Sequence, residues 1–214
     1  KPMKYFDIHT HQRPQQATEA VFSCFKEDYP LSEEIVRYSV GIHPWHLTES
    51  NADEHWQWLV EMANRPQVVA IGECGFDKLK GPSLVLQMDV FKRCVLLAEE
   101  RSLPLIIHAV KCSNELIRLK KELRPVQPWI IHGFRGKKEV AQAYLKHGFY
   151  LSFGEHYQEK SMCTVPLNKL FLETDESSLS IESIYQKAAH TLGMSVEELA
   201  RQISKNRQRL IPGF

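Results

Sequence analysis

The sequence lacks the marks of membrane, secreted and strongly nucleic-acid-binding proteins. It contains no apolar run long enough to cross a membrane and no recognisable secretory leader. Its 27 lysines and arginines nearly balance its 26 aspartates and glutamates, so no general positive field attracts nucleic acid. Any contact with a polyanion is therefore expected to be local or mediated by a metal ion.

Cysteine is present, but in a pattern that argues against two common structural roles. The cysteines are odd in number, irregularly spaced and never form a C-x-x-C pair: Cys24, Cys74, Cys94, Cys112 and Cys163. A disulfide framework or a structural zinc finger is therefore not expected, and a reducing cytoplasm is the simplest compartment. We expect these thiols to be buried small apolar side chains rather than nucleophiles.

Internal repeats, low-complexity tracts and linkers are also missing, so residues 1–214 are expected to form a single domain. No G-x-G-x-x-G motif follows the first apolar run, which disfavours a dinucleotide-binding sheet. What the chain does contain is an alternation of short apolar and amphipathic segments. Strands are predicted near residues 4–8, 20–25, 38–42, 68–72, 103–107, 128–131, 149–153 and 170–172.

Helices are predicted between most of these strands. Helical spacing of apolar residues, with capping boxes at 50–53 and 195–198, predicts helices over residues 56–63, 83–98, 114–123, 137–147, 181–192 and 195–209. Residues 31–34 fit a helical turn or a loop. Several strands are apolar throughout, which is typical of a parallel sheet covered by helices. The predicted fold class is therefore α/β, a TIM-type (β/α)8-like barrel, regular or distorted.

Metal-competent side chains fall where the predicted strands end. The first strand leads into a His-x-His pair, and later strands end in a carboxylate or an imidazole: His9, His11, Glu73, His108, His132 and Asp175. The carboxyl ends of barrel strands meet at one face, where barrel active sites lie. Six such ligands exceed one catalytic zinc site and suit two divalent ions that share a carboxylate, with Zn, Mg, Mn or Ni as candidates.

Each of these residues also has an ordinary structural interpretation. Glu73 could be a solvated loop acid, His108 and His132 could be core histidines bonded to backbone, and Asp175 could cap a helix. It is their joint occurrence at five strand ends that favours a metal site. His43 and His46 follow another strand end, where a substrate or supporting role competes with a surface loop.

Other side chains are expected to be structural. Four further histidines lie away from strand ends and are interpreted as surface or structural residues: His55, His147, His156 and His190. Trp45 and Trp56 could stack on a base, but core packing is the preferred interpretation. Cys74 follows Glu73, and strand alternation turns it away from the site.

Taken in order, the motifs resemble those of the TatD family of metal-dependent deoxyribonucleases, within the amidohydrolase-like barrels. The matching stretches are Asp7-Ile8-His9-Thr10-His11, Gly41-Ile42-His43-Pro44, Ala70-Ile71-Gly72-Glu73-Cys74-Gly75-Phe76-Asp77, Leu103-Pro104-Leu105-Ile106-Ile107-His108, Ile131-His132-Gly133-Phe134-Arg135-Gly136 and Leu172-Glu173-Thr174-Asp175, together with Gln87, Phe91 and Asn206-Arg207. The match runs along nearly the whole chain.

The resemblance implies a two-metal hydrolase that acts on ester bonds, namely the phosphodiesters of DNA. It implies one metal at His9, His11 and Asp175, a second at His108 and His132, and Glu73 as the bridge. Asp175 and Glu73 are the expected catalytic residues, with Asp175 orienting the attacking water and accepting its proton.

Two basic side chains further along the sequence are placed to contact substrate. Lys111 and Arg135 each lie three residues past a predicted metal ligand, where they could meet phosphate oxygens or simply be solvated loop charges. DNA or another phosphodiester is the expected partner, with no membrane and no obligate protein partner.

The chain departs from the family pattern in ways that weaken the DNA assignment. It is shorter, the region between the first and third strands is compressed, and Arg135 replaces a small hydroxyl residue. After Asp175 the family continues Ser-Pro-Tyr and then a basic segment, whereas this chain reads Glu176-Ser177-Ser178. Two alternatives therefore stay open: a metal-dependent hydrolase of a small phosphate ester, amide or lactone, and a non-catalytic binding protein.

Overall fold

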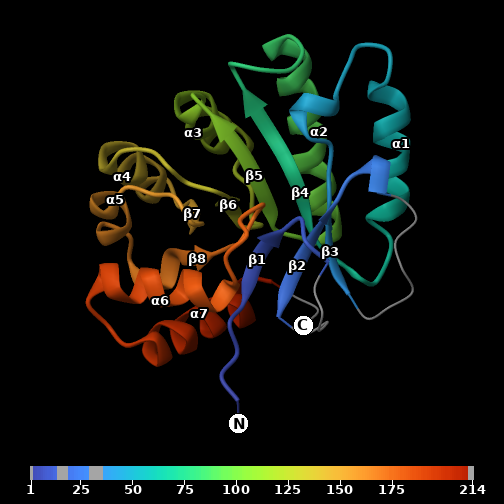
Figure 1. Ribbon diagram of the computed structural model, residues 1–214. Helices are drawn as coiled ribbons and strands as arrows, with labels where there is room; N and C mark the ends of the chain where they lie inside the picture. Colours follow the sequence, from blue (N-terminus) through green and yellow to red (C-terminus); the bar gives the residue numbers. More distant parts are fainter. Residues whose placement is uncertain (1, 14–18, 29–35, 212–214) are drawn as a thin grey trace.

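A computed structural model describes residues 2–13, 19–28 and 36–211 of the chain. Eight parallel strands form one sheet in which spatial order follows chain order (Figure 1). The strands are β1 (Asp7–Thr10), β2 (Ala20–Cys24), β3 (Arg37–Val40), β4 (Val68–Asp77), β5 (Leu105–Val110), β6 (Trp129–Ile131), β7 (Tyr150–Phe153) and β8 (Leu170–Leu172). The prediction of a parallel α/β sheet with eight short strands is confirmed.

The sheet curls until its first and last strands meet just beyond the end of β8. Asp175 N donates to His9 O at 2.9 Å, and His11 N donates to Asp175 O at 3.1 Å. Deeper in this seam the buried Asp7 carboxylate accepts hydrogen bonds from the Thr174 amide at 3.1 Å and the Thr174 hydroxyl at 2.6 Å. The result is a nearly closed barrel, which agrees with the predicted TIM-type fold.

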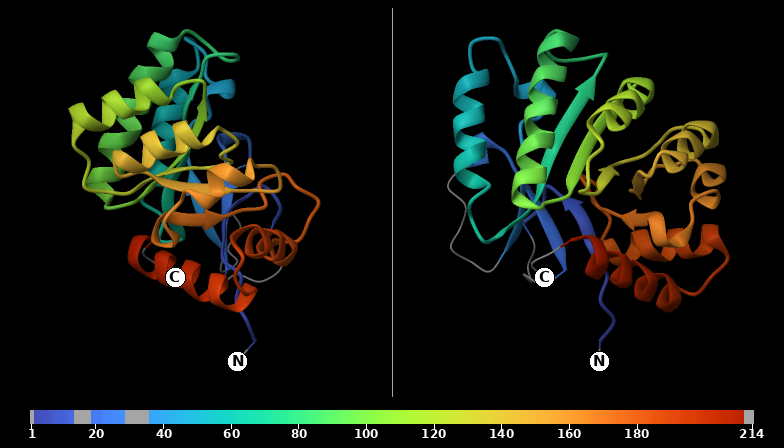
Figure 2. Two further views of the ribbon diagram at one scale, coloured as in Figure 1. Left: turned by 90° about the vertical axis from the view of Figure 1, so that its left-hand side faces the viewer. Right: turned by 180° about the vertical axis from the view of Figure 1, so that it is seen from behind.

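The helices lie on the outer side of the strands, as Figure 2 shows from two further directions. They are α1 (Ala52–Met62), α2 (Leu84–Arg101), α3 (Ser113–Leu123), α4 (Lys138–Lys146), α5 (Glu159–Cys163), α6 (Ile181–Leu192) and α7 (Val196–Leu210), with three short 3-10 helices, η1 (Lys26–Asp28), η2 (Pro44–His46) and η3 (Leu167–Lys169). Between β1 and β3 the only helix among the described residues is the short η1, in line with the compression seen in the sequence.

Two helix starts show how local chemistry sets the boundaries. Ser83 and Ser195 act as N-caps, their hydroxyls accepting from Leu86 N and Glu198 N, so the predicted helix start at Ser195 is confirmed. The box predicted at 50–53 is wrong. Helix α1 begins after Asn51, whose side chain makes no capping bond to the helix and instead accepts from the amide of Thr48.

Several strand boundaries differ from the prediction, and the differences affect the site. Strand β1 starts at Asp7 rather than residue 4, so His9 lies inside it. Strand β4 continues past Glu73 to Asp77 through a register shift against β5, and β5 continues past His108 to Val110. Helix α5 has no counterpart in the prediction, and residues 31–34 lie outside the described parts of the chain.

The barrel interior and the helix–sheet layer are filled by the predicted apolar runs. All ten residues of β4 are buried, and the rings of Phe76, Phe91 and Trp129 pack in a chain between β4, α2 and β6. Among the helices that the structure describes, none is long and apolar enough to cross a membrane.

The cysteines follow the prediction with one exception. Cys24, Cys74, Cys94 and Cys112 are buried free thiols, whereas Cys163 is free but exposed. Cys74 lies beside the carbonyl of Ile106, away from the metal-competent side chains, as strand alternation predicts. The reducing cytoplasm stays a prediction.

The seam between β8 and β1 gives a test of what closes the barrel. Replacing Thr174 by Val should lower the free energy of unfolding by about 1–3 kcal/mol, because the buried Asp7 carboxylate loses the hydroxyl that donates to its Oδ2 and keeps only backbone amide donors on Oδ1. Urea denaturation followed by circular dichroism measures the change. Thr164→Val, which removes a less buried hydroxyl, is the control and should cost less than about 1 kcal/mol. Equal losses in the two variants would contradict a special role for the seam.

Candidate metal centre

The barrel gathers all six predicted ligands at one end, around the carboxylate of Glu73. Oε2 of Glu73 lies 3.4 Å from His9 Nε2 and 3.2 Å from His11 Nε2. Its other oxygen, Oε1, lies 2.7 Å from His132 Nε2 and 3.7 Å from His108 Nδ1. Glu73 is only 2% exposed, so the imidazoles rather than water surround this charge. Each oxygen of this carboxylate thus has its own nearest pair of imidazoles, and the pairs adjoin, with the His9 and His132 ring centroids 4.3 Å apart.

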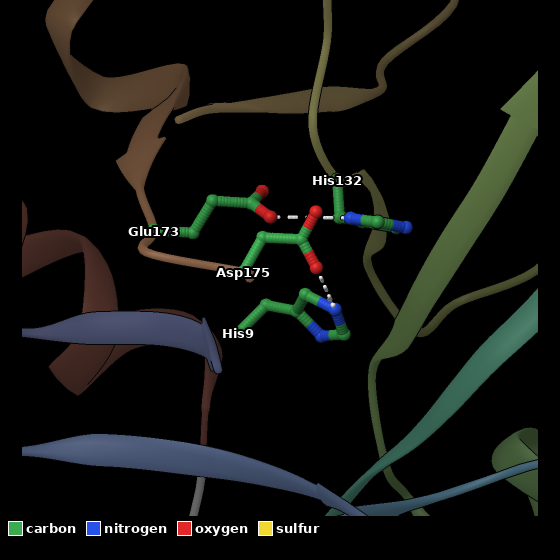
Figure 3. A group of neighbouring side chains, drawn as sticks. All are labelled: His9, His132, Glu173 and Asp175. Carbon is green, nitrogen blue, oxygen red and sulfur yellow. Dashed lines mark hydrogen bonds and ion pairs between the residues drawn. The ribbon is translucent and has the colours of Figure 1, made fainter. Parts of the chain in front are cut away.

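Asp175 completes the first of these two groups. Its Oδ1 lies 3.3 Å from the Nε2 atoms of both His9 and His11. Figure 3 shows the Asp175 carboxylate directed at the His9 ring. The residue has a left-handed backbone, with φ of 54°, and its amide and carbonyl are fixed by the β1 hydrogen bonds described above. Barrel closure therefore places this carboxylate.

The second group contains a residue that the sequence analysis placed farther away. His43 Nε2 lies 3.5 Å from Glu73 Oε1, and His43, Glu73 and His108 offer three ligand atoms within 4.8 Å of one another. Its other ring nitrogen, Nδ1, accepts from the Trp45 amide at 3.1 Å. Because Pro44 starts the tight η2 turn, the imidazole is held with Nε2 toward the cluster.

Two further acids, which the prediction did not assign to the site, orient the imidazoles. Glu173 is fully buried, and its carboxylate lies 3.1 Å from His132 Nδ1 (Figure 3) and accepts from Gly133 N at 2.6 Å. Asp77 lies 3.1 Å from His108 Nε2 and accepts from Trp45 Nε1 at 2.7 Å. Each acid fixes which imidazole nitrogen faces Glu73.

The donor set fits divalent cations. Both ring nitrogens of His9 are buried without a hydrogen-bond partner, although carboxylate oxygens lie 3.3 and 3.4 Å from Nε2. Donor atoms at the corners of a tetrahedron around a cation 2.0–2.1 Å away are separated by roughly 3.3 Å. The 3.3 and 3.4 Å separations between His9 Nε2 and the two carboxylate oxygens therefore match the spacing of ligand atoms around one bound cation.

The carboxylates of the cluster favour positive charge around them. Burial opposes a positive charge on His11, but hydrogen bonds to Asp175 and Glu73 outweigh it and raise its pKa to about 10. Burial would raise the pKa values of Glu73 and Asp175, yet the surrounding imidazoles hold both below their usual range. Burial lowers the pKa of His43 to about 3, so this ring is neutral. Because Nδ1 accepts from the Trp45 amide, the proton of the neutral ring lies on Nε2 and faces Glu73.

The predicted substrate contacts lie around this cluster. His46 and His43 line a cavity of about 170 Å³ over it, together with Phe25. Lys111 and Arg135 line a larger cavity of about 750 Å³ that opens on His108, His132 and Asp175.

The remaining aromatic and histidine predictions have mixed outcomes. The preferred interpretation of Trp45 is wrong, because it is 45% exposed and lines both cavities. Trp56 packs against the core as expected. The four other histidines belong to none of the groups of ligand atoms found among the described residues.

Comparison with known proteins identifies the family. A family model described as TatD related DNase matches residues 16–212. The chain belongs to the TatD family. It is 30% identical over 195 residues to YabD of Bacillus subtilis (strain 168), an uncharacterized metal-dependent hydrolase, with 80% of this chain and 76% of that protein covered. The 3'-5' ssDNA/RNA exonuclease TatD of Pantoea ananatis is 29% identical over 199 residues, with the same coverage. The chain is accordingly a TatD-family metal-dependent hydrolase.

Solved structures share the fold. A TatD-family hydrolase from Entamoeba histolytica superposes with a TM-score of 0.81 over 99% of each chain, at 16% identity. YJJV, a TatD homologue from Escherichia coli k12, gives a TM-score of 0.77 over 96% of each chain, at 18% identity. At these identities the likeness confirms the barrel fold alone.

The raised pKa of His11 predicts that the free energy of unfolding depends on pH when a chelator keeps the protein free of metal. Between the ordinary histidine pKa near 6.5 and about 10, the folded chain holds a proton on His11 that the unfolded chain has lost. This stabilisation is complete below pH 6.5 and disappears as the pH rises toward 10. His11→Asn should flatten that part of the stability curve, measured by urea denaturation at several pH values. An unchanged slope in the variant would contradict the assignment.

Proposed function

We propose that the chain is a two-metal phosphodiesterase that cleaves DNA. The observation that carries the proposal is the position of Glu73, whose two oxygens face two different groups of imidazoles. A carboxylate so placed suits a bridge between two divalent cations, with Zn, Mg, Mn or Ni as candidates. His9, His11 and Asp175 would hold one cation, and His108 and His132 the other, with the Nε2–H of His43 directed at Glu73.

Nucleic acid is supported as substrate by the relatives and by the surroundings of the cluster. Several similar proteins are named 3'-5' ssDNA/RNA exonuclease TatD. Lys111 and Arg135 are exposed and line the cavity beside the metal ligands, where they can contact phosphate oxygens. They provide the local positive charge that a nearly neutral chain needs.

The residues of the chain divide the chemistry between them. When bound, divalent cations lower the pKa of water toward neutrality and neutralise charge that develops on phosphoryl oxygens. Asp175 is fixed by backbone hydrogen bonds on both sides, so its carboxylate is positioned to orient the water and to accept its proton. Glu173 and Asp77 hold the His132 and His108 rings in place, which keeps the ligand geometry constant during the reaction.

A second candidate function rests on Glu176. This exposed carboxylate lines three cavities that adjoin the cluster, and among the described residues it has no ion-pair or hydrogen-bond partner. A negative charge at this position opposes a polyanionic strand and favours a smaller ester. Hydrolysis of a small phosphate ester, amide or lactone is therefore the alternative.

A substrate panel decides between the two functions. The protein loaded with Mn²⁺ or Zn²⁺ should shorten a single-stranded DNA oligonucleotide and hydrolyse bis(p-nitrophenyl) phosphate, and EDTA should abolish both activities. Nitrophenyl acetate, a lactone and an anilide serve as competing substrates. Hydrolysis of the carbonyl substrates alone would replace the phosphodiesterase proposal. No turnover of any substrate by metal-loaded protein would reject both and favour a binding role.

The bridging role of Glu73 has its own test. Glu73→Gln should reduce the metal content measured by elemental analysis and lower phosphodiesterase kcat by a factor on the order of 10² or more, because the charge shared by both cations is lost. Glu100→Gln, an exposed position on α2, is the matched control and should retain metal and activity. Full metal occupancy in the Glu73 variant would contradict the bridge.

A further inference from the structure

The largest cavity beside the metal cluster is more than an approach route. It has a volume of about 750 Å³ and runs from the ligands His108, His132 and Asp175 to the helix α4. Its walls come largely from the segments around the ends of β5 and β6. These segments carry Lys111 and Arg135, the two basic side chains predicted to bind phosphate. Small-molecule sites commonly enclose about 300–1,000 Å³, so the cavity can hold a whole nucleotide unit next to the cluster.

The chemistry of the lining changes along the cavity. Near the metal ligands it is charged, with Lys111 and Arg135 exposed at the edge. On the side of α4 it is apolar and aromatic, with Val140 and Tyr144 from α4 and the neighbouring Phe134. A ligand that matches both parts has an anionic group at one end and a flat, weakly polar ring at the other.

Tyr144 supplies a specific polar group in the apolar part. Only 3% of this residue is exposed, and among the described residues its hydroxyl has no hydrogen-bond partner. Its ring is fixed by Phe149 at 4.8 Å and by Phe134 at 6.1 Å between centroids. Burial raises the pKa of the phenol above its ordinary value, so the hydroxyl keeps its proton at neutral pH. Among the described residues this hydroxyl is not one of the fully buried polar atoms without a partner, so it reaches the cavity and can bond a ligand there.

The wall that carries Phe134 and Arg135 is rigid. Phe134 N donates to Ser152 O at 2.9 Å, Gln158 Nε2 donates to Arg135 O at 3.1 Å, and the buried Ser161 hydroxyl donates to Gly136 O at 2.6 Å. The cavity is thus preformed by contacts with β7 and the short α5 region, which lowers the entropic cost of binding.

We propose that this cavity binds the nucleoside of a nucleotide whose phosphate lies at the metal cluster, with the Tyr144 hydroxyl hydrogen-bonded to the base. Lys111 and Arg135 contact the phosphate, and the Phe134–Val140 wall packs against the ring system. The inference rests on the proposed phosphodiesterase function and extends it, since it assigns the recognition of the nucleoside to a defined part of the barrel mouth.

Calorimetry of the Mn²⁺-loaded protein tests the assignment with thymidine 5'-monophosphate, inorganic phosphate and phenyl phosphate as probes. The nucleotide should bind at least tenfold more tightly than phosphate. Tyr144→Phe should weaken nucleotide binding about 3- to 10-fold and leave both other probes unchanged, because neither offers a hydrogen-bonding base. Since the hydroxyl bonds no described residue, this variant should melt like the parent. Tyr150→Phe, outside the cavity, is the matched control.

A second variant tests the cavity itself. Val140→Phe should fill the space and reduce nucleotide affinity toward that of phosphate, while phosphate binding stays unchanged. Equal affinities of the parent for nucleotide and phosphate, or an unaltered nucleotide affinity in Tyr144→Phe, would overturn the proposal. If DNA is still cleaved in that case, the cavity assignment alone fails. If no phosphodiester is cleaved, the proposed function fails as well.

Discussion

The ionised carboxylate of Glu73, buried at the barrel mouth, is the constraint on which the rest of the site depends. A charge removed from water in this way needs opposite charge around it. Imidazoles from β1, β5 and β6 converge on it, and each approaches one particular oxygen. The barrel satisfies this need because its parallel strands all point their carboxyl ends toward the same face. Without that convergence the acid would have to take up a proton.

The same region closes the barrel. The backbone of Asp175 bonds to β1 on both sides, and its side chain faces the two β1 histidines. The fold and the cluster are therefore built from shared groups. Glu173 and Asp77 extend the arrangement outward, since each holds one imidazole and also accepts a further hydrogen bond from Gly133 or Trp45. The ligand geometry is thus determined by several independent contacts.

Much of this arrangement follows from local sequence signals, and the rest does not. Apolar runs identify all eight strands, and the polar residues at the ends of five of them identify the six side chains that meet at the barrel mouth, because strand direction alone decides where such residues lie. The roles of Glu173, Asp77 and His43 depend on how side chains from different strands meet. The extension of β4 beyond Glu73 depends on a register shift against β5, which no local pattern encodes. Trp45 looks like a core residue until its bond to Asp77 fixes it at the mouth.

The seam between β8 and β1 has a consequence for how this chain can diverge. Its hydrogen bonds come from the backbone of residues that also carry the cluster's side chains. Substitutions, insertions or deletions there would therefore disturb closure and chemistry together. Sequence changes that alter specificity are therefore expected in the loops outside the seam, such as the segment around Arg135 or the residues after Asp175. Substrate specificity can then change while the seam and the side-chain cluster at the carboxyl ends of the strands stay the same.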